Sequence, residues 1–388
     1  MNPTALILGG GTFGLTAALE LRARGWHVTL LDAGEIPHPD AASTDISKVV
    51  RMDYGSDEQY TAMGELSIQR WHEWNARWNE ELYHEDGFLI MTRGDMQPGS
   101  FEHDSHAFLS TRGHHLIRTD EDSLSTKHPQ WNASAFPNGY LNPRGGWAES
   151  GRVVMRLKQD ALLAGVVIQE QVPFGSWIEY GGRLCGMKDA RGHEWRADVT
   201  VSALGAWTAE YLPWLRDRLW ATAQPVFHFR PGNPEAYRAP AFPVWAADIG
   251  TTGWYGFPAN ADGIVKVANH GPGRRARASA PRIMPDGEEQ RFREFLRETF
   301  PTLADAPLAG SRICLYGDSF DGNFLFAHDP GHPGLVVAAG DSGHAFKFTP
   351  VLGELIADTV ERKTNPWLTR FAWREPAGAG GEGARAKG

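Results

Sequence analysis

The sequence predicts an α/β fold in which a domain with a parallel sheet is joined to a second domain built on a mixed or antiparallel sheet. Short apolar strands that end in glycine occur near residues 9, 204 and 339, as expected when distant segments build one parallel sheet. Between them, residues 224–270 are rich in β-forming residues, which indicates a separate sheet. A chain of 388 residues is long enough for both domains.

The first of these strands belongs to a strand–helix–strand unit at the N-terminus. Residues 4–9 form a short apolar run, and the Ala/Leu-rich residues 13–24 have the composition of a helix. Gly25 ends that helix, because glycine adopts the left-handed C′ conformation without strain. Residues 27–31 form the second strand, which Asp32 closes. This order of elements is that of a Rossmann-type βαβ unit.

The turn inside this unit carries a fingerprint for a dinucleotide. Three glycines follow the strand with G-x-G-x-x-G spacing, and an acid follows about 20 residues later. The glycines permit the turn, the approach of a pyrophosphate and close helix packing, while the acid binds a ribose diol. The fingerprint does not separate FAD from NAD, and a glycine-rich turn in an unrelated α/β protein is the alternative interpretation. The expected nucleotide contacts are Gly9, Gly11, Thr12, Phe13, Gly14 and Asp32.

The remaining elements divide the chain into alternating segments. Helices are expected at about 58–81, 286–299 and 350–361, and buried strands at 198–204 and 335–339. We assign residues 1–85, 148–222 and 306–370 to the first domain, residues 86–147 and 223–305 to the second, and the low-complexity residues 371–388 to a disordered tail.

Composition and charge argue against several classes of protein. The net charge is −9, whereas nucleic-acid-binding domains usually present a basic surface. No apolar run approaches the roughly 18 to 20 residues that span a bilayer, and the N-terminus lacks the features of a signal peptide. Cys185 and Cys314 are too few for a disulfide framework, and the histidines lack metal-ligand spacing. We therefore expect a cytoplasmic protein without a metal, a membrane anchor or a nucleic-acid partner.

Motifs along the whole chain resemble those of one enzyme family. Besides the fingerprint, they are KVVR at 48–51, YGFP at 255–258, KVANH at 266–270, CLY at 314–316 and GDSGHAFKF at 340–348. In this order they are similar to the monomeric sarcosine oxidase family, which includes N-methyltryptophan oxidase, pipecolate oxidase and the fructosyl-amino-acid oxidases, or amadoriases. The resemblance implies FAD rather than NAD, and it implies a monomer that acts on a small amine or amino acid.

The resemblance also implies that FAD is held covalently. Cys314 matches the family cysteine whose sulfur is attached to the 8-methyl group of the isoalloxazine ring. Attachment requires a thiolate, which basic surroundings favour, and a buried structural cysteine is the alternative. Small glycines in the 340–348 segment allow close approach to the ring, where a lysine would stabilise negative charge. The residues that the resemblance adds to the FAD contacts are Ser43, Lys48, Cys314, Gly340, Gly343, His344 and Lys347.

A cationic substrate site is a further implication of the resemblance. Arg51 matches the family's carboxylate-binding arginine, whose guanidinium suits a bidentate bond, and Lys347 is expected to assist it. Lys266 matches the lysine that bonds through water to flavin N5 and promotes the reduction of O2, because an ammonium stabilises developing negative charge. The residues with expected catalytic roles are Lys48, Tyr255, Lys266 and His270.

Together these features predict an FAD-dependent oxidase that converts a secondary amine or N-substituted amino acid to an imine and reduces O2 to H2O2. Three alternatives are a dehydrogenase of the same fold, a biosynthetic oxidase of a cyclic amino or imino acid, and a flavoprotein without turnover. Asp341 replaces the aromatic residue of sarcosine-type members and is closer to the amadoriases, and Ala345 replaces a glycine. The chain is shorter than most amadoriases, which argues against a large sugar pocket.

Overall fold

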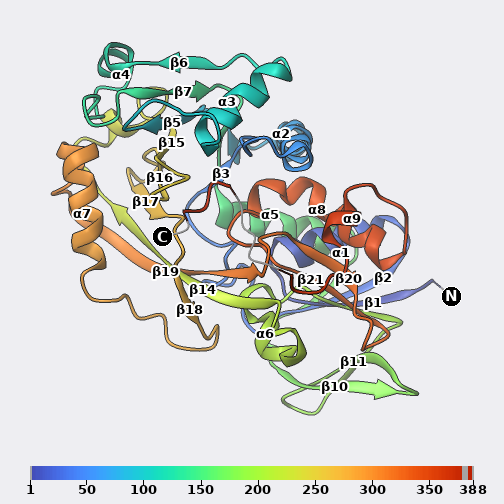
Figure 1. Ribbon diagram of the computed structural model, residues 1–388. Coiled ribbons are helices and arrows are strands. Elements are labelled where there is room, and N and C mark those ends of the chain that lie inside the picture. Colours follow the sequence, from blue (N-terminus) through green and yellow to red (C-terminus); the bar gives the residue numbers. More distant parts are fainter. Residues whose placement is uncertain (1, 378–382, 387–388) are drawn as a thin grey trace.

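Two large sheets organise the protein in the computed structural model, which describes residues 2–377 and 383–386. Figure 1 shows them as separate layers, one covered by the helices α1, α5 and α8 and the other by α7. The α/β fold class predicted from the sequence is confirmed. The helices are α1 (Thr12–Ala23), α2 (Glu58–Trp78), α3 (Phe101–Thr111), α4 (Glu121–Lys127), α5 (Ser150–Leu163), α6 (Thr208–Tyr211), α7 (Glu288–Thr299), α8 (Thr349–Val360) and α9 (Leu368–Phe371).

The first sheet is the parallel sheet that the N-terminal unit predicts. Its strands lie in the order β20 (Leu325–His328), β21 (Leu335–Ala339), β13 (Val199–Ser202), β1 (Thr4–Leu8), β2 (His27–Leu31) and β9 (Val167–Gln169). All neighbours are parallel except β20, which runs antiparallel to β21. The strands β1, β13 and β21 are buried along nearly their whole length, since helices cover the sheet, and this explains their continuous apolar sequences.

The close packing of α1 against β1 depends on Gly14. A Cβ atom at this position would lie 1.8 Å from the carbonyl oxygen of Gly9, so no side chain fits here without moving the backbone. The third glycine of the fingerprint therefore brings the first turn of α1 against the end of β1. The helix α8 packs along the other side of α1 and completes this layer.

The second sheet is mixed and has nine strands. Its order is β18 (Arg274–Ala276), β14 (Leu219–Phe229), β17 (Val265–Asn269), β16 (Trp254–Phe257), β15 (Val244–Ala247), β5 (Phe88–Thr92), β7 (Asn138–Asn142) and β6 (Ile117–Thr119), and β19 (Leu308–Ser319) pairs with β14. Within this sheet, the described pair of β15 and β5 is parallel, and the other recorded pairs are antiparallel. Two smaller sheets hold β3 (Lys48–Val50), β8 (Gly146–Ala148) and β4 (Tyr83–His84), and β10 (Phe174–Tyr180), β11 (Arg183–Asp189) and β12 (Glu194–Arg196).

Aromatic side chains form the core between α7 and the second sheet. The rings of Trp254 and Phe295 stack with centroids 4.2 Å apart, and those of Trp245 and Phe300 lie 4.8 Å apart. Each aromatic ring buries a large apolar area, so these contacts attach α7 firmly to the sheet. Trp131, Trp245 and Trp254 therefore serve packing in this core.

The long strands β14 and β19 connect the two halves of the molecule. β14 runs without interruption across residues 222 and 223, where we placed a domain boundary, and β19 pairs with it from residue 308 onward. All strands of the parallel sheet come from segments that we assigned to the first domain. The division into two domains stays a prediction, as does the monomeric state.

The end of the chain differs from our expectation of disorder. Phe371 is fully buried, Arg374 binds Asp321 at 2.6 Å, and the side chain of Ala384 lies within the apolar cluster beside Phe257. The described parts of the predicted tail, residues 371–377 and 383–386, thus have defined contacts, because they cover surfaces that would otherwise expose apolar and ionic groups. The rest of the predicted tail lies outside the described residues. Within the described ranges, no helix has both the length and the apolar composition of a membrane span.

Candidate active site

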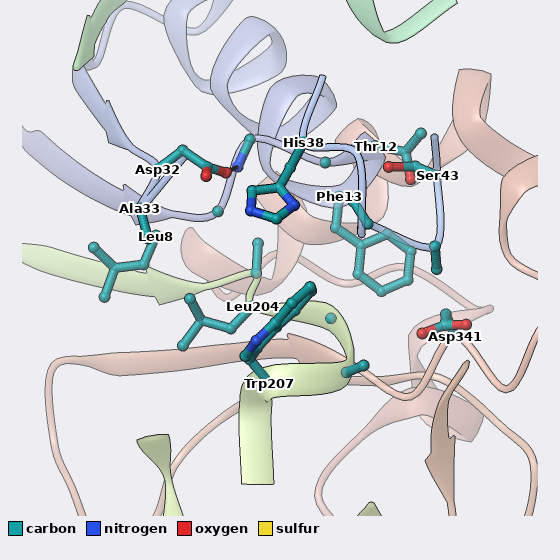
Figure 2. Close-up of a pocket in the computed structure, with 18 of the residues that line it drawn as sticks. Leu8, Thr12, Phe13, Asp32, Ala33, His38, Ser43, Leu204, Trp207 and Asp341 are labelled. Carbon is teal, nitrogen blue, oxygen red and sulfur yellow. Dashed lines mark hydrogen bonds between the residues drawn. The ribbon is translucent and has the colours of Figure 1, made fainter. Parts of the chain in front are cut away.

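An elongated cavity of about 1330 Å³, its open mouth included, runs along the carboxyl ends of the parallel strands. The ends of β1, β2 and β13 contribute Leu8, Leu31 and Leu204 to its wall. Ligands of open α/β sheets bind at this edge, because the loops that follow the strands diverge there. Figure 2 shows Asp32 and Asp341 at opposite ends of the cavity. The shape suits an extended ligand such as a dinucleotide.

One end of the cavity is built mainly from backbone atoms. Gly11 is the N-cap of α1 and offers no side chain to the first N–H groups of the helix, which therefore face the cavity as an anion site. The two carboxylate oxygens of Asp32 accept hydrogen bonds from the N–H groups of Gly10 (2.7 Å) and Gly34 (2.9 Å). Burial raises the pKa of Asp32, and these N–H groups counteract the shift. Each oxygen keeps a lone pair for a ribose hydroxyl.

The other end adjoins a second cavity of about 590 Å³. Lys48, Tyr316, Gly343 and Phe346 line both cavities, so a ring system placed between these residues would face both spaces. Gly343 has φ +76°, and a Cβ atom there would lie 2.4 Å from the ring of Tyr316, so glycine is required. The dinucleotide cradle formed by the glycine turn and Asp32, the N-terminus of α1 and this junction together fit FAD. Its phosphates would lie at α1 and its isoalloxazine ring at the junction.

Two buried hydroxyl groups near the junction support this fit. Among the described residues, Thr44 Oγ1 and Ser47 Oγ have no hydrogen-bond partner in the protein. Both lie between Ser43 and Lys48, and these two flanking residues line the cofactor cavity. Buried polar atoms are normally satisfied by hydrogen bonds, so this stretch has bonding capacity for a bound molecule.

The second cavity contains a cationic wall. Arg51 is 5% exposed, and its guanidinium lies over the rings of Tyr54 and Phe101, 4.8 and 5.4 Å from their centroids. It also donates a hydrogen bond to the carbonyl oxygen of Asp53. The aromatic contacts fix the plane of the guanidinium and leave it in the cavity wall, where a carboxylate can bind it.

Lys347 reaches the same cavity through a chain of hydrogen bonds. Its Nζ donates to Tyr54 Oη and to the carbonyl oxygen of His344, each at 2.9 Å. His344 Nε2 lies 2.9 Å from the carbonyl oxygen of Gly322, so this nitrogen carries a proton and donates. In the neutral imidazole, Nδ1 then accepts the hydrogen bond from Tyr54 Oη at 3.0 Å. Tyr54 therefore links the lysine to the histidine in a fixed orientation.

The second cavity also carries an aromatic and imidazole cluster. His270 Nδ1 lies 3.4 Å from Tyr316 Oη, and its ring is 6.5 Å from that of Tyr255 in an edge-on arrangement. Burial raises the pKa of Tyr316 well above its ordinary value, and the nearby phenol of Tyr255 adds to the shift. Tyr316 is therefore a neutral hydrogen-bonding group, in contrast to the cations of the same cavity.

Lys266 and Cys314 lie behind the cavity walls. Lys266 on β17 is 1% exposed; its Nζ donates to the carbonyl oxygen of Ser47 at 2.6 Å and lies 2.7 Å from Asp45 Oδ2. Burial lowers its pKa to about 8, although Asp45 opposes the shift. Cys314 on β19 is buried, and its Sγ lies 3.8 Å from Lys48 Nζ. Lys266 and Arg282 also interact electrostatically with this sulfur.

The structure brings together most of the residues that the sequence predicts. Those in the wall of the first cavity are Gly9, Gly11, Thr12, Phe13, Asp32, Ser43, Lys48 and Gly343. Those in the wall of the second are Lys48, Arg51, Tyr255, His270, Gly343, His344 and Lys347. Gly14, Lys266, Cys314 and Gly340 line neither cavity. Their roles in binding and catalysis stay predictions.

Sequence reasoning missed four residues of the site. Tyr54 follows the KVVR motif by three positions, and Tyr316 ends the CLY motif, so proximity to these motifs was an available signal. Trp207 lines the first cavity opposite His38, with ring centroids 5.7 Å apart (Figure 2). Asp45 gave no signal, because its partners come from distant strands. No group of three or more His, Cys, Asp or Glu side chains that could hold a metal was found in the described ranges.

Comparisons with known proteins agree with this geometry. The family described as DAO, FAD dependent oxidoreductase, matches residues 4–359. L-saccharopine oxidase of Schizosaccharomyces pombe is 26% identical over 97% of this chain and 94% of its own length. Monomeric sarcosine oxidase of Bacillus sp. (strain B-0618) is 22% identical over 96% of each chain. The solved structure of fructosamine oxidase (Amadoriase II) of Aspergillus fumigatus is 26% identical, with a TM-score of 0.80 over 96% of this chain and 89% of its own.

These matches confirm the resemblance to the sarcosine oxidase and amadoriase enzymes, and they extend over nearly the whole chain. The family description and the dinucleotide cradle agree on the cofactor, which is FAD. The chain belongs to the FAD-dependent oxidoreductase family.

Proposed function

We propose that this enzyme oxidises the C–N bond of a secondary amine or N-substituted amino acid to an imine and reduces O2 to H2O2. The observation that carries the proposal is the cavity with Arg51 and Lys347 in its wall, which shares Lys48, Tyr316 and Gly343 with the cofactor cavity. The names of the similar proteins, L-saccharopine oxidase, monomeric sarcosine oxidase and fructosamine oxidase, support an amine or amino acid as the substrate.

The cationic wall would bind the substrate carboxylate. Arg51 and Lys347 place two positive charges in the wall of one cavity, where a carboxylate would bind them. A carboxylate held at this wall directs the rest of a small substrate toward the junction of the two cavities. Binding of this kind positions the reacting C–N bond and lowers the entropic part of the barrier.

The aromatic and imidazole cluster would hold the amine. His270 and Tyr255 line the same cavity, and the amine reacts in its unprotonated form, which the nearby cations favour because they lower the pKa of an ammonium. FAD, when bound, supplies the acceptor for the two electrons that leave the C–N bond. Two protons leave with these electrons, O2 accepts the equivalent of both to form H2O2, and water hydrolyses the imine to a carbonyl compound and an amine.

Lys266 would promote the reduction of O2. Its ammonium is buried beside Ser47 and Lys48, next to the flavin end of the cavity. Negative charge develops on oxygen when O2 is reduced, and a fixed cation in a water-excluded site lowers the energy of that charge. Lys48, which lies in the walls of both cavities, would add to the same positive potential.

A peroxide assay tests the proposed function. The purified holoenzyme is mixed with a panel of N-methyl, N-carboxyalkyl and N-fructosyl amino acids, and both bleaching of the flavin and release of H2O2 are recorded. We expect at least one member to bleach the flavin under nitrogen and to give about one H2O2 per amine oxidised in air. Bleaching without peroxide in air indicates a dehydrogenase, and a product with an intact ring indicates the cyclic amino or imino acid oxidase. Failure of every amine to bleach the flavin would contradict the proposal.

Covalent attachment of FAD through Cys314 is a second part of the proposal. Lys48, Lys266 and Arg282 surround the thiol, and positive charge favours the thiolate that attachment requires. Acid precipitation of the holoenzyme should leave the flavin in the pellet, whereas a Cys314→Ala protein should release it. The matched control is Cys185→Ala, since this half-buried cysteine lies on β11, away from both cavities. Release of the flavin from the unmodified protein would show that Cys314 is structural.

A further inference from the structure

A buried ion cluster lies beneath the junction of the two cavities. Asp45 Oδ2 is 2.7 Å from Lys266 Nζ, and Asp45 Oδ1 is 3.1 Å from His228 Nε2. The side chains of Asp45 and Lys266 are 2% and 1% exposed. The three residues come from a loop, β17 and β14, so only the folded protein assembles the cluster. None of the three lines a cavity, and the catalytic roles proposed above do not involve Asp45 or His228.

The charge balance of this cluster depends on Asp45. Lys266 faces the positive charge of Lys48 and the sulfur of Cys314, and burial opposes its own charge. The pKa of Asp45 lies well below its ordinary value, because Lys266, His228 and Lys48 together outweigh the cost of its burial. Asp45 is therefore ionised at any pH at which the protein works. Its carboxylate is the main attraction that keeps the ammonium of Lys266 charged.

The position of Lys266 also depends on Asp45. The lysine side chain is flexible, and its Nζ is fixed here by two contacts, the Asp45 carboxylate and the Ser47 carbonyl. The Nζ lies 4.6 Å above the ring of Phe257, which lines the second cavity, so a small change in the position of Nζ changes its distance from that cavity. His228 holds the far oxygen of Asp45 and limits movement of the carboxylate.

We propose that Asp45, held by His228, is a positioning residue that keeps the Lys266 ammonium charged and directed at the flavin end of the cavities. The inference rests on the proposed role of Lys266 in O2 reduction and adds the groups that make that role effective at neutral pH. A buried ion pair that only stabilised the fold would have no such effect on the flavin.

The test uses the holoenzyme after photoreduction, so that no substrate is needed. The rate constant of reoxidation by O2 is measured from pH 5.5 to 9.5 in the unmodified protein and in Asp45→Asn. The pKa of Lys266 is about 8, so the unmodified protein should react fast below this pH and slowly above it. Without the carboxylate the pKa falls further, and the decline in rate should move to lower pH by at least one unit. At pH 7.5 a shift of one unit lowers the charged fraction of Lys266 about threefold, so we expect a loss in rate of about threefold or more.

Three variants separate positioning from a structural role. Asp329→Asn is the matched control, because this carboxylate is also 2% exposed but binds Trp214 and backbone N–H groups away from both cavities. It should leave the pH profile unchanged. Asp45→Glu should restore part of the rate at neutral pH. In a Lys266→Met background, Asp45→Asn should cause no further loss in rate, because its effect passes through the lysine.

A second readout does not depend on O2. The absorption spectrum of the oxidised flavin is titrated with pH, and we expect a transition that disappears in Lys266→Met and moves to lower pH in Asp45→Asn. If reoxidation is slow in the unmodified protein and indifferent to Lys266, the proposed oxidase function fails, and the flavin titration still tests the inference. An Asp45→Asn protein that folds, binds FAD and keeps both pH profiles would overturn the inference.

Discussion

The two ends of the cofactor cavity are built in different ways. The end near Asp32 is built around one continuous stretch, residues 9–34, which presents backbone N–H groups and one acid. The end near Asp341 collects side chains from β3, β16, β19, the turn after β17 and the segment after β21, and Lys48, Arg51, Lys347 and Asp341 among them are ionisable. In the proposed function, the first end would recognise what all dinucleotides share, and the second would determine the chemistry. Substitutions at the first end should therefore reduce stability and FAD binding, whereas substitutions at the second end should reduce activity.

The largest effect is expected at the backbone-built end. A Gly14→Val side chain would place its Cβ 1.8 Å from the Gly9 carbonyl oxygen, so either α1 or the turn must move. We expect a loss of more than about 3 kcal/mol in the free energy of unfolding and little or no bound FAD. Flavin absorbance per protein and thermal unfolding measure both effects. The control is Gly25→Val, where φ is +90° and a Cβ meets nothing within 4 Å, so it measures backbone strain without a clash, whereas Gly14 does not have a positive φ.

A smaller and different effect is expected at the charged end. Arg51→Lys keeps the positive charge but loses the planar fork that can bind both oxygens of a carboxylate. We expect kcat/KM for an amino-acid substrate to fall about 10- to 100-fold, mainly through KM, with FAD content unchanged. Steady-state peroxide assays measure the loss, and Arg70→Lys on α2, which pairs with Glu354 outside both cavities, is the control. An equal loss with a primary amine that lacks a carboxylate would contradict the assignment.

The smallest effect is expected for Tyr54→Phe. The substitution keeps the ring under Arg51 and removes the hydroxyl that connects Lys347 to His344. One hydrogen bond to a charged group contributes about 1.5–3 kcal/mol at most, and part of it is recovered by rearrangement. We therefore expect roughly a tenfold loss in kcat/KM and a change of a few degrees or less in melting temperature. A full loss of activity would mean that Tyr54 takes part directly in the reaction.

The same contrast explains how far the sequence could be interpreted. The parallel sheet, its fingerprint and the helices α1, α2, α7 and α8 could be predicted, because they depend on local periodicity and on glycine spacing. The charged residues of the second cavity were found through motifs that resemble a known family. Periodicity alone would not have grouped Arg51 with Lys347, which are 296 positions apart and share one cavity because residues 346–348 pack against β3.

The remainder of the site could not be predicted, for physical reasons. The proposed role of Asp45 depends on its contacts with Lys266 and His228, which lie on two strands of the second sheet and are far from Asp45 in the sequence. The C-terminal segment was expected to be disordered because its composition is rich in glycine and alanine. Small residues can also pack where there is little space, as Ala384 does in the apolar cluster beside Phe257. Composition cannot distinguish these two outcomes.

The contacts of that C-terminal segment have a practical consequence for work on this enzyme. Arg385 binds Asp318 through two hydrogen bonds of 2.6 and 2.8 Å, and the N–H of Ala386 donates to the carbonyl oxygen of His270. A purification tag placed directly after Ala386 would thus begin beside His270, which lines the second cavity. Asn2, at the other end of the described chain, is exposed, so fusion proteins and immobilised forms of this enzyme are better attached there.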